Sequence, residues 1–519
     1  MTQELVSRGG TSVGVGEGAE QMPRIEITAE DLTISVGTGK KEKHALTDVT
    51  ARFGAGQLTA LMGPSGAGKT TLLNALTGIG KIASGKISFN GAPRPPNFMA
   101  MCAVIPQEDT LYGALTPRET FTYVARLRLG DNVPKEVKAA AVESMLTRLE
   151  LLKCADTFVG NEDIRGISGG EKKRTSIGCE LMVNPAVLFV DEPTSGLDAK
   201  MARSVVEHLR SLAHEEGRTV ITVIHQPSWR IFQLFDSLVL LKDGRTSFDG
   251  PVGDVKDYFS RIGFTAPADE NPMDYYFDIL QEPAAADDGG EEDAAKAVGG
   301  GTAVDSAERG EAVVAKEDYH GAESVFSIKW KEEVRRRVAA GETVQASAGS
   351  SDGAGDADVA AAAEAAAAAA SRTSSLSQFV TLSDRCCYDY VRDKTKLGGG
   401  VALKLSIGSL FGLIWLNQAR GKATQDKIFT TEGPIFFCCF SSVFDTLFAF
   451  IIKYPLTRSL IQREYRNRYY SVGPYFFAEL LARSVFECFN AVLLAIPTVQ
   501  LFFPLLFLAY DCVGTGSPH

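Results

Sequence analysis

The chain of 519 residues is acidic, with a formal net charge of −11 and a sequence pI of about 5.3. Hydrophobic residues make up 45% of it and aromatic residues 9%, which suits two or more domains with sizeable cores. The chain lacks the basic excess typical of nucleic-acid binding, and its nine cysteines form no CxxC pair and no metal-like spacing. We therefore expect no nucleic-acid partner.

Residues 1–23 contain glycine and serine but no apolar core like that of a signal peptide, so we expect a disordered N-terminus. From about 24 to 282, predicted strands alternate with predicted helices, which favours an α/β domain. The region 115–180 is mostly helical in pattern, and we interpret it as a helical subdomain of that domain.

The most informative segment is the glycine-rich stretch GPSGAGKTT at 63–71. An apolar run at 58–62 precedes it as a predicted buried strand, and 71–76 follows as a predicted helix. This context predicts a phosphate-binding loop, in which Lys69 reaches the β- and γ-phosphates and the Thr70 hydroxyl ligates Mg²⁺. The predicted nucleotide-binding residues are Gly63, Pro64, Ser65, Gly66, Ala67, Gly68, Lys69, Thr70 and Thr71.

Two carboxylates end a second predicted buried strand. The apolar run 186–190 is typical of a parallel strand, and Asp191 and Glu192 follow it directly. Because buried charges need partners, this pair indicates a site in which Asp191 holds Mg²⁺ and Glu192 polarises an attacking water. Another apolar strand ends in His225, which we assign to the same site.

Two further motifs are less specific when each is taken alone. Gln107 follows the short apolar run 103–106. The stretch ISGGEKKR at 167–174 opens a predicted helix, so the N–H groups of its first residues and the helix dipole could face a phosphate. The same stretch is also consistent with an ordinary capped helix start.

In their order these motifs resemble the Walker A, Q-loop, signature, Walker B, D-loop and H-loop of ATP-binding cassette (ABC) transporters. In that family two cassettes enclose two ATP molecules, and each ATP contacts Walker A of one cassette and the signature of the other. The resemblance implies that His225 contacts the γ-phosphate and that Gln107 links Mg²⁺ to the membrane domain. The implied signature residues for the partner's ATP are Ser168, Gly169, Gly170 and Glu171, and the implied D-loop residues are Ser195, Gly196, Leu197 and Asp198.

The details are similar to the G subfamily, the White-type half-transporters, in which the cassette precedes the membrane domain. The likeness is carried by 107–129, 224–245 and 271–280. It implies ATP and Mg²⁺ as cofactors, a second half-transporter as homo- or heterodimeric partner, and a lipid, sterol or other hydrophobic compound as substrate. One departure concerns the adenine base, because 36–49 holds no aromatic residue to stack on it, which leaves His44 or an aliphatic side chain for that contact.

Residues 283–375 are rich in Ala, Gly and Asp, which predicts a low-complexity linker that buries too little apolar surface to fold. Within it, 324–338 has the pattern of a short helix. A passive spacer is the favoured interpretation of the linker, and a regulatory role is the alternative.

The remaining chain predicts an amphipathic connecting helix at 376–396, an all-α membrane domain of incomplete ABC-2 type at 397–510 and a tail at 511–519. Pro497 is expected to end or kink the last membrane span. The distribution of Lys and Arg favours a cytosolic cassette in a multi-pass membrane protein. The span candidates are about 399–417, 434–452 and 475–497.

Two features of this region bear on mechanism. Loop 453–474 resembles the subfamily's coupling helix, with interfacial anchoring by Arg and Tyr as the alternative. Glu479, Arg483 and Glu487 share one helix face, and we expect a salt bridge among them.

The subfamily has six spans, so we expect a product truncated after the third. The main hypothesis is an ATP-hydrolysing half-transporter that dimerises and exports a hydrophobic compound. The alternative is a membrane-bound regulatory or dominant-negative subunit that binds ATP and dimerises without transporting.

Overall fold

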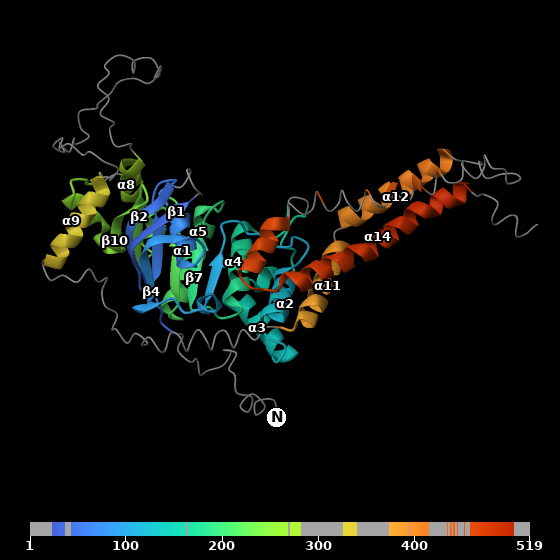
Figure 1. The fold of residues 1–519 in the computed structure, drawn as a ribbon, viewed down its shortest axis with the longest axis horizontal. Helices are drawn as coiled ribbons and strands as arrows, with labels where there is room; N and C mark the ends of the chain where they lie inside the picture. Colours follow the sequence, from blue (N-terminus) through green and yellow to red (C-terminus); the bar gives the residue numbers. More distant parts are fainter. Residues whose placement is uncertain are drawn as a thin grey trace, which may run out of the picture. The chain divides into compact units, whose positions relative to one another are not determined.

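The computed structural model describes residues 23–36, 43–161, 164–267, 270–281, 325–339, 373–392, 394–414 and 457–502, with isolated positions between 433 and 451. The chain divides into two compact units (Figure 1). The first combines Met1–Asp109 with Gly169–Ala369, and the second combines Thr110–Ser168 with Ala370–His519.

The first unit is organised around a six-stranded sheet. Its strands, in spatial order, are β10 (Arg245–Pro251), β9 (Ser237–Lys242), β3 (Leu58–Met62), β8 (Thr219–Val223), β7 (Val187–Asp191) and β6 (Cys102–Ile105). All neighbours are parallel except β10, which pairs antiparallel with β9. Because parallel strands end at the same edge, the loops after β3, β6, β7 and β8 leave the sheet on one side, where α/β proteins bind ligands.

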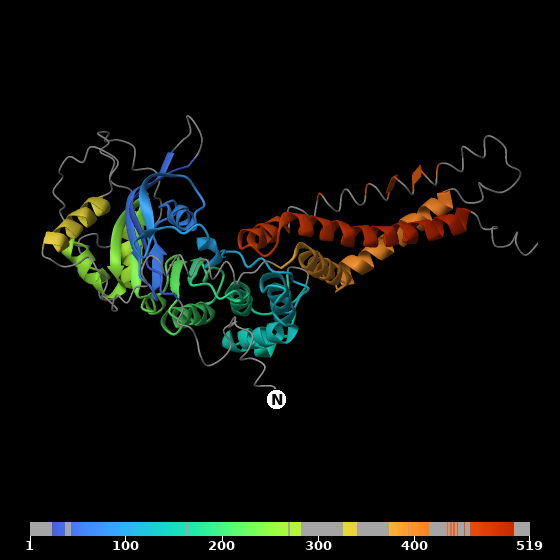
Figure 2. The same ribbon diagram turned by 60° about the horizontal axis from the view of Figure 1, so that its bottom comes forward.

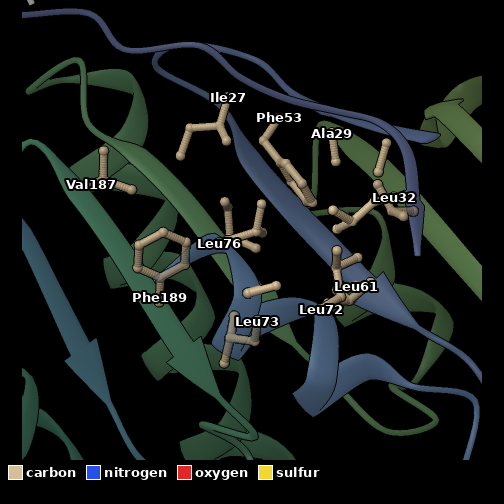
Figure 3. Packing of buried hydrophobic residues seen from close by; sticks show 14 of the residues in the cluster. Ile27, Ala29, Leu32, Phe53, Leu61, Leu72, Leu73, Leu76, Val187 and Phe189 are labelled. Carbon is tan, nitrogen blue, oxygen red and sulfur yellow. The ribbon is translucent and has the colours of Figure 1, made fainter. Parts of the chain in front are cut away.

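A second sheet, of four strands, pairs antiparallel in the order β2 (Lys43–Phe53), β1 (Ile27–Val36), β4 (Ile82–Phe89) and β5 (Ala92–Pro93). Helix α1 (Lys69–Leu76) contributes to the core that both sheets share. Figure 3 shows Leu72 and Leu76 of α1 among Phe53 of β2 and Phe189 of β7, and all four are 0% exposed. Burying each such side chain contributes about 1.5–3 kcal/mol, so α1 and the loop before it are firmly anchored.

The other helices of the first unit are α4 (Gly169–Leu181), α5 (Ala199–His214), α6 (Trp229–Phe232), α7 (Val255–Arg261), α8 (Pro272–Gln281) and α9 (Val325–Ala339). Short 3₁₀ turns occur at Phe98–Ala100, Leu152–Cys154 and Val252–Asp254. Helix α5 turns Val205, Leu209 and Leu212 inward at helical spacing, which explains why it packs on the sheet at β3 and β8.

Helix α9 belongs to the first unit, although the sequence suggests only a short helix inside a linker. Phe326 and Trp330 are 6% and 5% exposed, and the Trp330 ring lies 5.4 Å from that of Phe248 and 5.5 Å from that of Tyr258. Figure 1 shows α9 beside β10 and α8. An Arg261–Glu333 ion pair of 2.9 Å adds a polar contact. This part of the predicted linker is therefore docked on the α/β domain.

The second unit contains α2 (Pro117–Arg128), α3 (Lys135–Arg148), α11 (Ser375–Arg392), α12 (Lys394–Ile414) and α14 (Val472–Phe502), together with a helical stretch at 457–466. Figures 1 and 2 both show α12 alongside α14, and α11 contacts the two of them. The predicted connecting helix corresponds to α11, which ends at Arg392.

Among the described residues, Val472–Thr498 within α14 is long and apolar enough to cross a membrane, and Gly398–Ile414 within α12 is a shorter apolar helix. They overlap the third and first predicted spans, whereas the span predicted at 434–452 lies largely outside the described residues. The expected salt bridge is confirmed for Arg483 and Glu479, whose Nε and Oε1 atoms are 2.7 Å apart.

Pro497 does not end the third predicted span, since α14 continues through it to Phe502. A close helix crossing accommodates it. A Cβ at Gly408 of α12 would lie 2.7 Å from Pro497 Cγ, and Thr498 Oγ1 donates a hydrogen bond of 3.0 Å to the Gly408 carbonyl. A small residue at 408 thus lets the two helices approach at the proline, as is common between membrane helices.

The docking of α9 predicts that Trp330→Ala releases this helix, because the change removes a large buried side chain at a typical cost of about 3–5 kcal/mol. Limited proteolysis of the full chain should then cleave within 325–339 much faster than in the wild type. Lys331→Ala on the same helix is the matched control and should leave the cleavage rate unchanged. Equal protection in the Trp330→Ala and wild-type proteins would contradict the docking.

The docking of α9 on the first unit should also weaken at acidic pH. Hydrogen bonds from Arg336 and Arg337 outweigh burial and lower the pKa of Glu333 from its ordinary 4.5 to about 2. A carboxyl group whose pKa is lower in the docked state stabilises that state at any pH above its ordinary pKa of 4.5. This stabilisation is lost as the pH falls from about 4.5 towards 2. Protection of α9 from a protease active in acid should therefore decline over that window, and Glu333→Gln should remove this decline.

Candidate nucleotide site

The glycine-rich loop leaves β3 at the shared sheet edge and leads into α1. Its backbone admits only glycine at two places. At Gly63 (φ 148°) a Cβ would lie 2.1 Å from the Leu241 carbonyl oxygen, and at Gly68 (φ 95°) it would lie 2.4 Å from Leu46 Cδ2. These contacts explain the spacing of glycines in the motif, because the loop is wedged between β9 and β2.

Lys69 folds back over the loop. Its Nζ donates hydrogen bonds of 2.8 Å to the carbonyl oxygens of Gly63 and Pro64, and the residue is 6% exposed. Burial lowers the pKa of Lys69, while the nearby carboxylates Glu192 and Asp191 act in the opposite direction. By contrast, Ser65, Gly66 and Thr70 are exposed, so the loop is accessible to a phosphate group.

The carboxylate pair lies at the end of β7. Burial, followed by the neighbouring Glu192, raises the pKa of Asp191, and the cations Lys173 and Lys69 counteract this rise. Glu192 has a left-handed backbone (φ 43°), which is uncommon for a residue with a side chain and concentrates at functional sites. Its N–H donates to the Val223 carbonyl at 2.9 Å, so β8 holds this conformation.

Two other predicted site residues, Gln107 and His225, contact Glu192. Gln107 Nε2 donates a hydrogen bond of 2.6 Å to Glu192 Oε2, and His225 Nε2 lies 3.4 Å from Glu192 Oε1. They follow β6, β7 and β8, three adjacent strands, as the shared edge requires. An acid flanked by an amide and an imidazole can orient a water molecule and accept its proton.

The oxygen ligands predicted for Mg²⁺ fit that ion. Thr70 offers a hydroxyl, Gln107 an amide oxygen and Asp191 a carboxylate. Among the described residues no three His, Cys, Asp or Glu side chains gather as a metal site.

The predicted D-loop and signature residues contact each other. Asp198 caps α5 by accepting hydrogen bonds from the N–H groups of Lys200 and Met201 at 3.0 and 2.8 Å. A Cβ at Gly169 would lie 3.0 Å from Leu197 Cδ2, and one at Gly170 would lie 3.2 Å from Met201. Gly170 and Glu171 continue the first turn of α4, Ser168 immediately precedes it, and Ser195 and Gly196 form the turn before Leu197.

Sequence reasoning missed Lys173, which lies in the signature stretch 167–174. Its run of charged neighbours suggests a solvated helix face, yet the side chain is 1% exposed. His44 is one of the residues suggested for the contact with the adenine base. His44 is exposed and its Nδ1 lies 3.0 Å from Ser35 Oγ, and residues 37–42 lie outside the described part of the chain.

The second unit holds a buried charge cluster. Arg385 of α11 is 2% exposed and binds Glu464 in a bidentate pair of 2.7 and 2.9 Å. Tyr470 donates a hydrogen bond of 2.7 Å to the same carboxylate, and the guanidinium lies 4.5 Å from the centre of the Tyr112 ring. Burial opposes the Arg385 charge, but Glu464 nevertheless raises the pKa of Arg385. The cluster joins α11, the stretch 457–466 and the segment before α2.

Two more contacts extend this junction. Arg392 Nη1 binds both carboxylate oxygens of Glu119 at 2.6 and 2.8 Å, and Glu119 also completes the capping box of α2 with Thr116. Burial opposes the Glu119 charge, but the bond from Arg392 lowers the pKa of Glu119 overall. Arg463 donates to the Thr110 carbonyl at 2.8 Å, three residues along the chain from Gln107.

Comparison with known proteins agrees with these observations. A family profile described as ABC transporter matches residues 46–195, and two described as ABC-2 type transporter match 225–294 and 377–510. ABC transporter G family member 25 of Arabidopsis thaliana is 44% identical over 46% of this chain and 36% of its own length. The broad substrate specificity ATP-binding cassette transporter ABCG2 of Sus scrofa is 31% identical over 82% of this chain and 62% of its own length.

Among solved structures, a dimeric ATP-binding cassette in a post-hydrolysis state with ADP and phosphate is 23% identical and covers 44% of this chain and 98% of its own, with a TM-score of 0.37. The chain spans between 36% and 62% of the length of the two curated relatives named above. The matches to ABC transporter and ABC-2 type transporter profiles, together with G-family relatives of which one aligns over 82% of the chain, identify the chain as a member of the ABC transporter family, G subfamily.

Proposed function

We propose that the chain is a half-transporter that couples ATP hydrolysis to export of a lipid, sterol or other hydrophobic compound across a membrane, with its cassette in the cytosol. The observation that carries this proposal is the meeting of Gln107 and His225 at Glu192, at the sheet edge where the phosphate-binding loop also lies. An acid flanked by an amide and an imidazole beside a phosphate-binding loop supports a role in ATP hydrolysis.

The phosphate-binding loop would hold the triphosphate through its backbone N–H groups and Lys69. Lys69 would exchange its bonds to the Gly63 and Pro64 carbonyls for bonds to phosphate oxygens. Glu192 would exchange the Gln107 amide for the attacking water and accept its proton, while His225 would contact the γ-phosphate. Mg²⁺, when bound, would neutralise charge on the phosphates, with Thr70, Asp191 and Gln107 as its protein ligands.

A second half-transporter would complete each ATP site with its own Ser168, Gly169, Gly170 and Glu171. The arrangement of Gly169 against Leu197 supports this, because it keeps the start of α4 fixed beside the D-loop. The positive end of the α4 dipole would then face the γ-phosphate held by the partner.

The junction in the second unit would transmit the cassette's movement to the membrane helices. Thr110, three residues after Gln107, accepts a hydrogen bond from Arg463, and the next residue, Glu464, is held by Arg385 of the connecting helix α11. A charged pair in bidentate geometry transmits displacement better than a loose apolar contact, because its geometry is fixed. We therefore assign the coupling role to the stretch 457–466.

The catalytic assignment predicts that Lys69→Ala weakens ATP binding, whereas Glu192→Gln retains ATP and lowers turnover by at least about 100-fold, since it removes the general base. Both should be measured on the purified membrane protein in lipid nanodiscs, by fluorescent-nucleotide binding and by phosphate release. His208→Ala, which changes a histidine outside the site, is the control. Near-normal turnover by Glu192→Gln would refute the role of Glu192, and ATP turnover without substrate movement in vesicles would favour a regulatory subunit.

The coupling assignment predicts a specific pattern of stability. Arg385→Met leaves Glu464 buried without its partner and should cost about 3–5 kcal/mol, whereas Arg385→Met with Glu464→Met should recover most of this loss. Thermal unfolding of the nanodisc-bound protein measures both, with Arg458→Met on the exposed side of the same stretch as control. If the single and double variants are equally unstable, the pair does not act as a unit.

A further inference from the structure

Lys173 is the one lysine on α4 that is buried, at 1% exposure, and it carries its charge inside the first unit. Its Nζ donates a hydrogen bond of 2.8 Å to the main-chain carbonyl of Gln107 and lies 2.9 Å from Asp109 Oδ1. A buried ammonium group is costly unless it is paired. The Q-loop supplies both partners, so Lys173 ties the signature helix to the Q-loop.

The same helix is held at its start by the D-loop. Gly169 and Gly170 lie against Leu197 and Met201 so closely that a Cβ on either would be 3.0–3.2 Å away. Lys173 is one helical turn further along, so α4 is fixed at one point by the D-loop and at the next by the Q-loop. A shift of the Q-loop backbone therefore has to move α4 or break the Lys173 contacts.

Lys173 also lies close to the nucleotide site without being part of the loop that holds phosphate. Its bond goes to the Gln107 main chain, whereas the Gln107 side chain is bonded to Glu192. The main chain and the side chain of one residue thus connect the signature helix to the catalytic carboxylate.

We propose that Lys173 is a positioning residue that transmits the state of one cassette's Q-loop to its signature helix, and hence to the ATP bound by the partner cassette. This rests on the proposed function, in which the signature of one chain serves the nucleotide of the other. If nucleotide binding draws the Gln107 side chain away from Glu192, the Gln107 carbonyl moves with it, and Lys173 with Asp109 makes α4 follow. Each site then becomes competent only when the Q-loop of the other chain is engaged.

The test compares Lys173→Met, Lys173→Arg and Asp109→Asn in the full chain in nanodiscs. We expect fluorescent-ATP affinity and the Mg²⁺ concentration for half-maximal activity to stay within about twofold of wild type. We expect kcat to fall about 10- to 100-fold in Lys173→Met and Asp109→Asn, since small displacements of a positioned group have effects of this size. Lys173→Arg, which keeps the charge, should recover part of kcat, and the Lys173→Met, Asp109→Asn double variant should be no slower than the slower single variant.

Lys172→Met, at a half-buried neighbouring position on α4, is the matched control for a general weakening of the helix. Unchanged kcat in Lys173→Met and Asp109→Asn would overturn the proposal. A shift in ATP affinity or Mg²⁺ requirement as large as the loss of kcat would also overturn it, because Lys173 would then act on its own chain's site. If Lys173→Met does not fold, as judged by lost ATP binding, Asp109→Asn decides alone.

The proposed function is tested separately by the wild type. If it releases no more phosphate than Lys69→Ala, the ATPase assignment fails and this inference fails with it. If the wild type turns over ATP and the Lys173 and Asp109 variants match it, only the inference fails.

Discussion

The constraint on which the first unit depends is the common direction of β3, β6, β7 and β8. Because these strands are parallel, the loop that follows each leaves at one edge, which brings Glu192 into contact with Gln107, 85 positions earlier in the chain, and with His225. Gln107, Glu192 and His225 meet for this reason alone. The core around α1 holds that edge in place, since Leu72 and Leu76 are fully enclosed between the two sheets. The site therefore needs no loop to close before its acid, amide and imidazole are assembled.

Buried charge is the second organising theme, and the structure uses it at junctions rather than in the core. Lys173 pairs with Asp109, Arg385 with Glu464, and each pair joins segments far apart in sequence. Such pairs add little net stability compared with apolar contacts of the same volume, but breaking one partner is costly. They therefore suit positions where two elements must keep one relative geometry, as expected where movement is passed on. The aromatic rings of Tyr112 and Tyr470 around Arg385 complete its surroundings without adding a competing charge.

The sequence was sufficient to predict the α/β fold, the strand ends that carry Asp191, Glu192 and His225, and the helical pattern around α2, because glycine spacing and apolar runs are local signals. It was insufficient for three features that depend on distant partners. Burial of Lys173 depends on the Q-loop, docking of α9 depends on rings from β10 and α7, and passage of α14 through Pro497 depends on Gly408 of another helix. The local pattern indicated a short helix inside a linker for α9 and a proline that ends or kinks the span, and nothing in it marked Lys173 as buried.

The hydrogen bonds of Glu192 and Lys69 bear on how the proposed hydrolysis would be controlled. Glu192 accepts a hydrogen bond from Gln107, and Lys69 donates to a carbonyl of its own loop, so each of the two groups has a partner within the site. Under the proposed function, ATP would replace each of these bonds with one of similar strength, and further contacts would come from the signature residues of the second half-transporter. Because Gln107 is held through its side chain by Glu192 and through its main chain by Lys173, release of the catalytic acid and movement of the signature helix become one event rather than two.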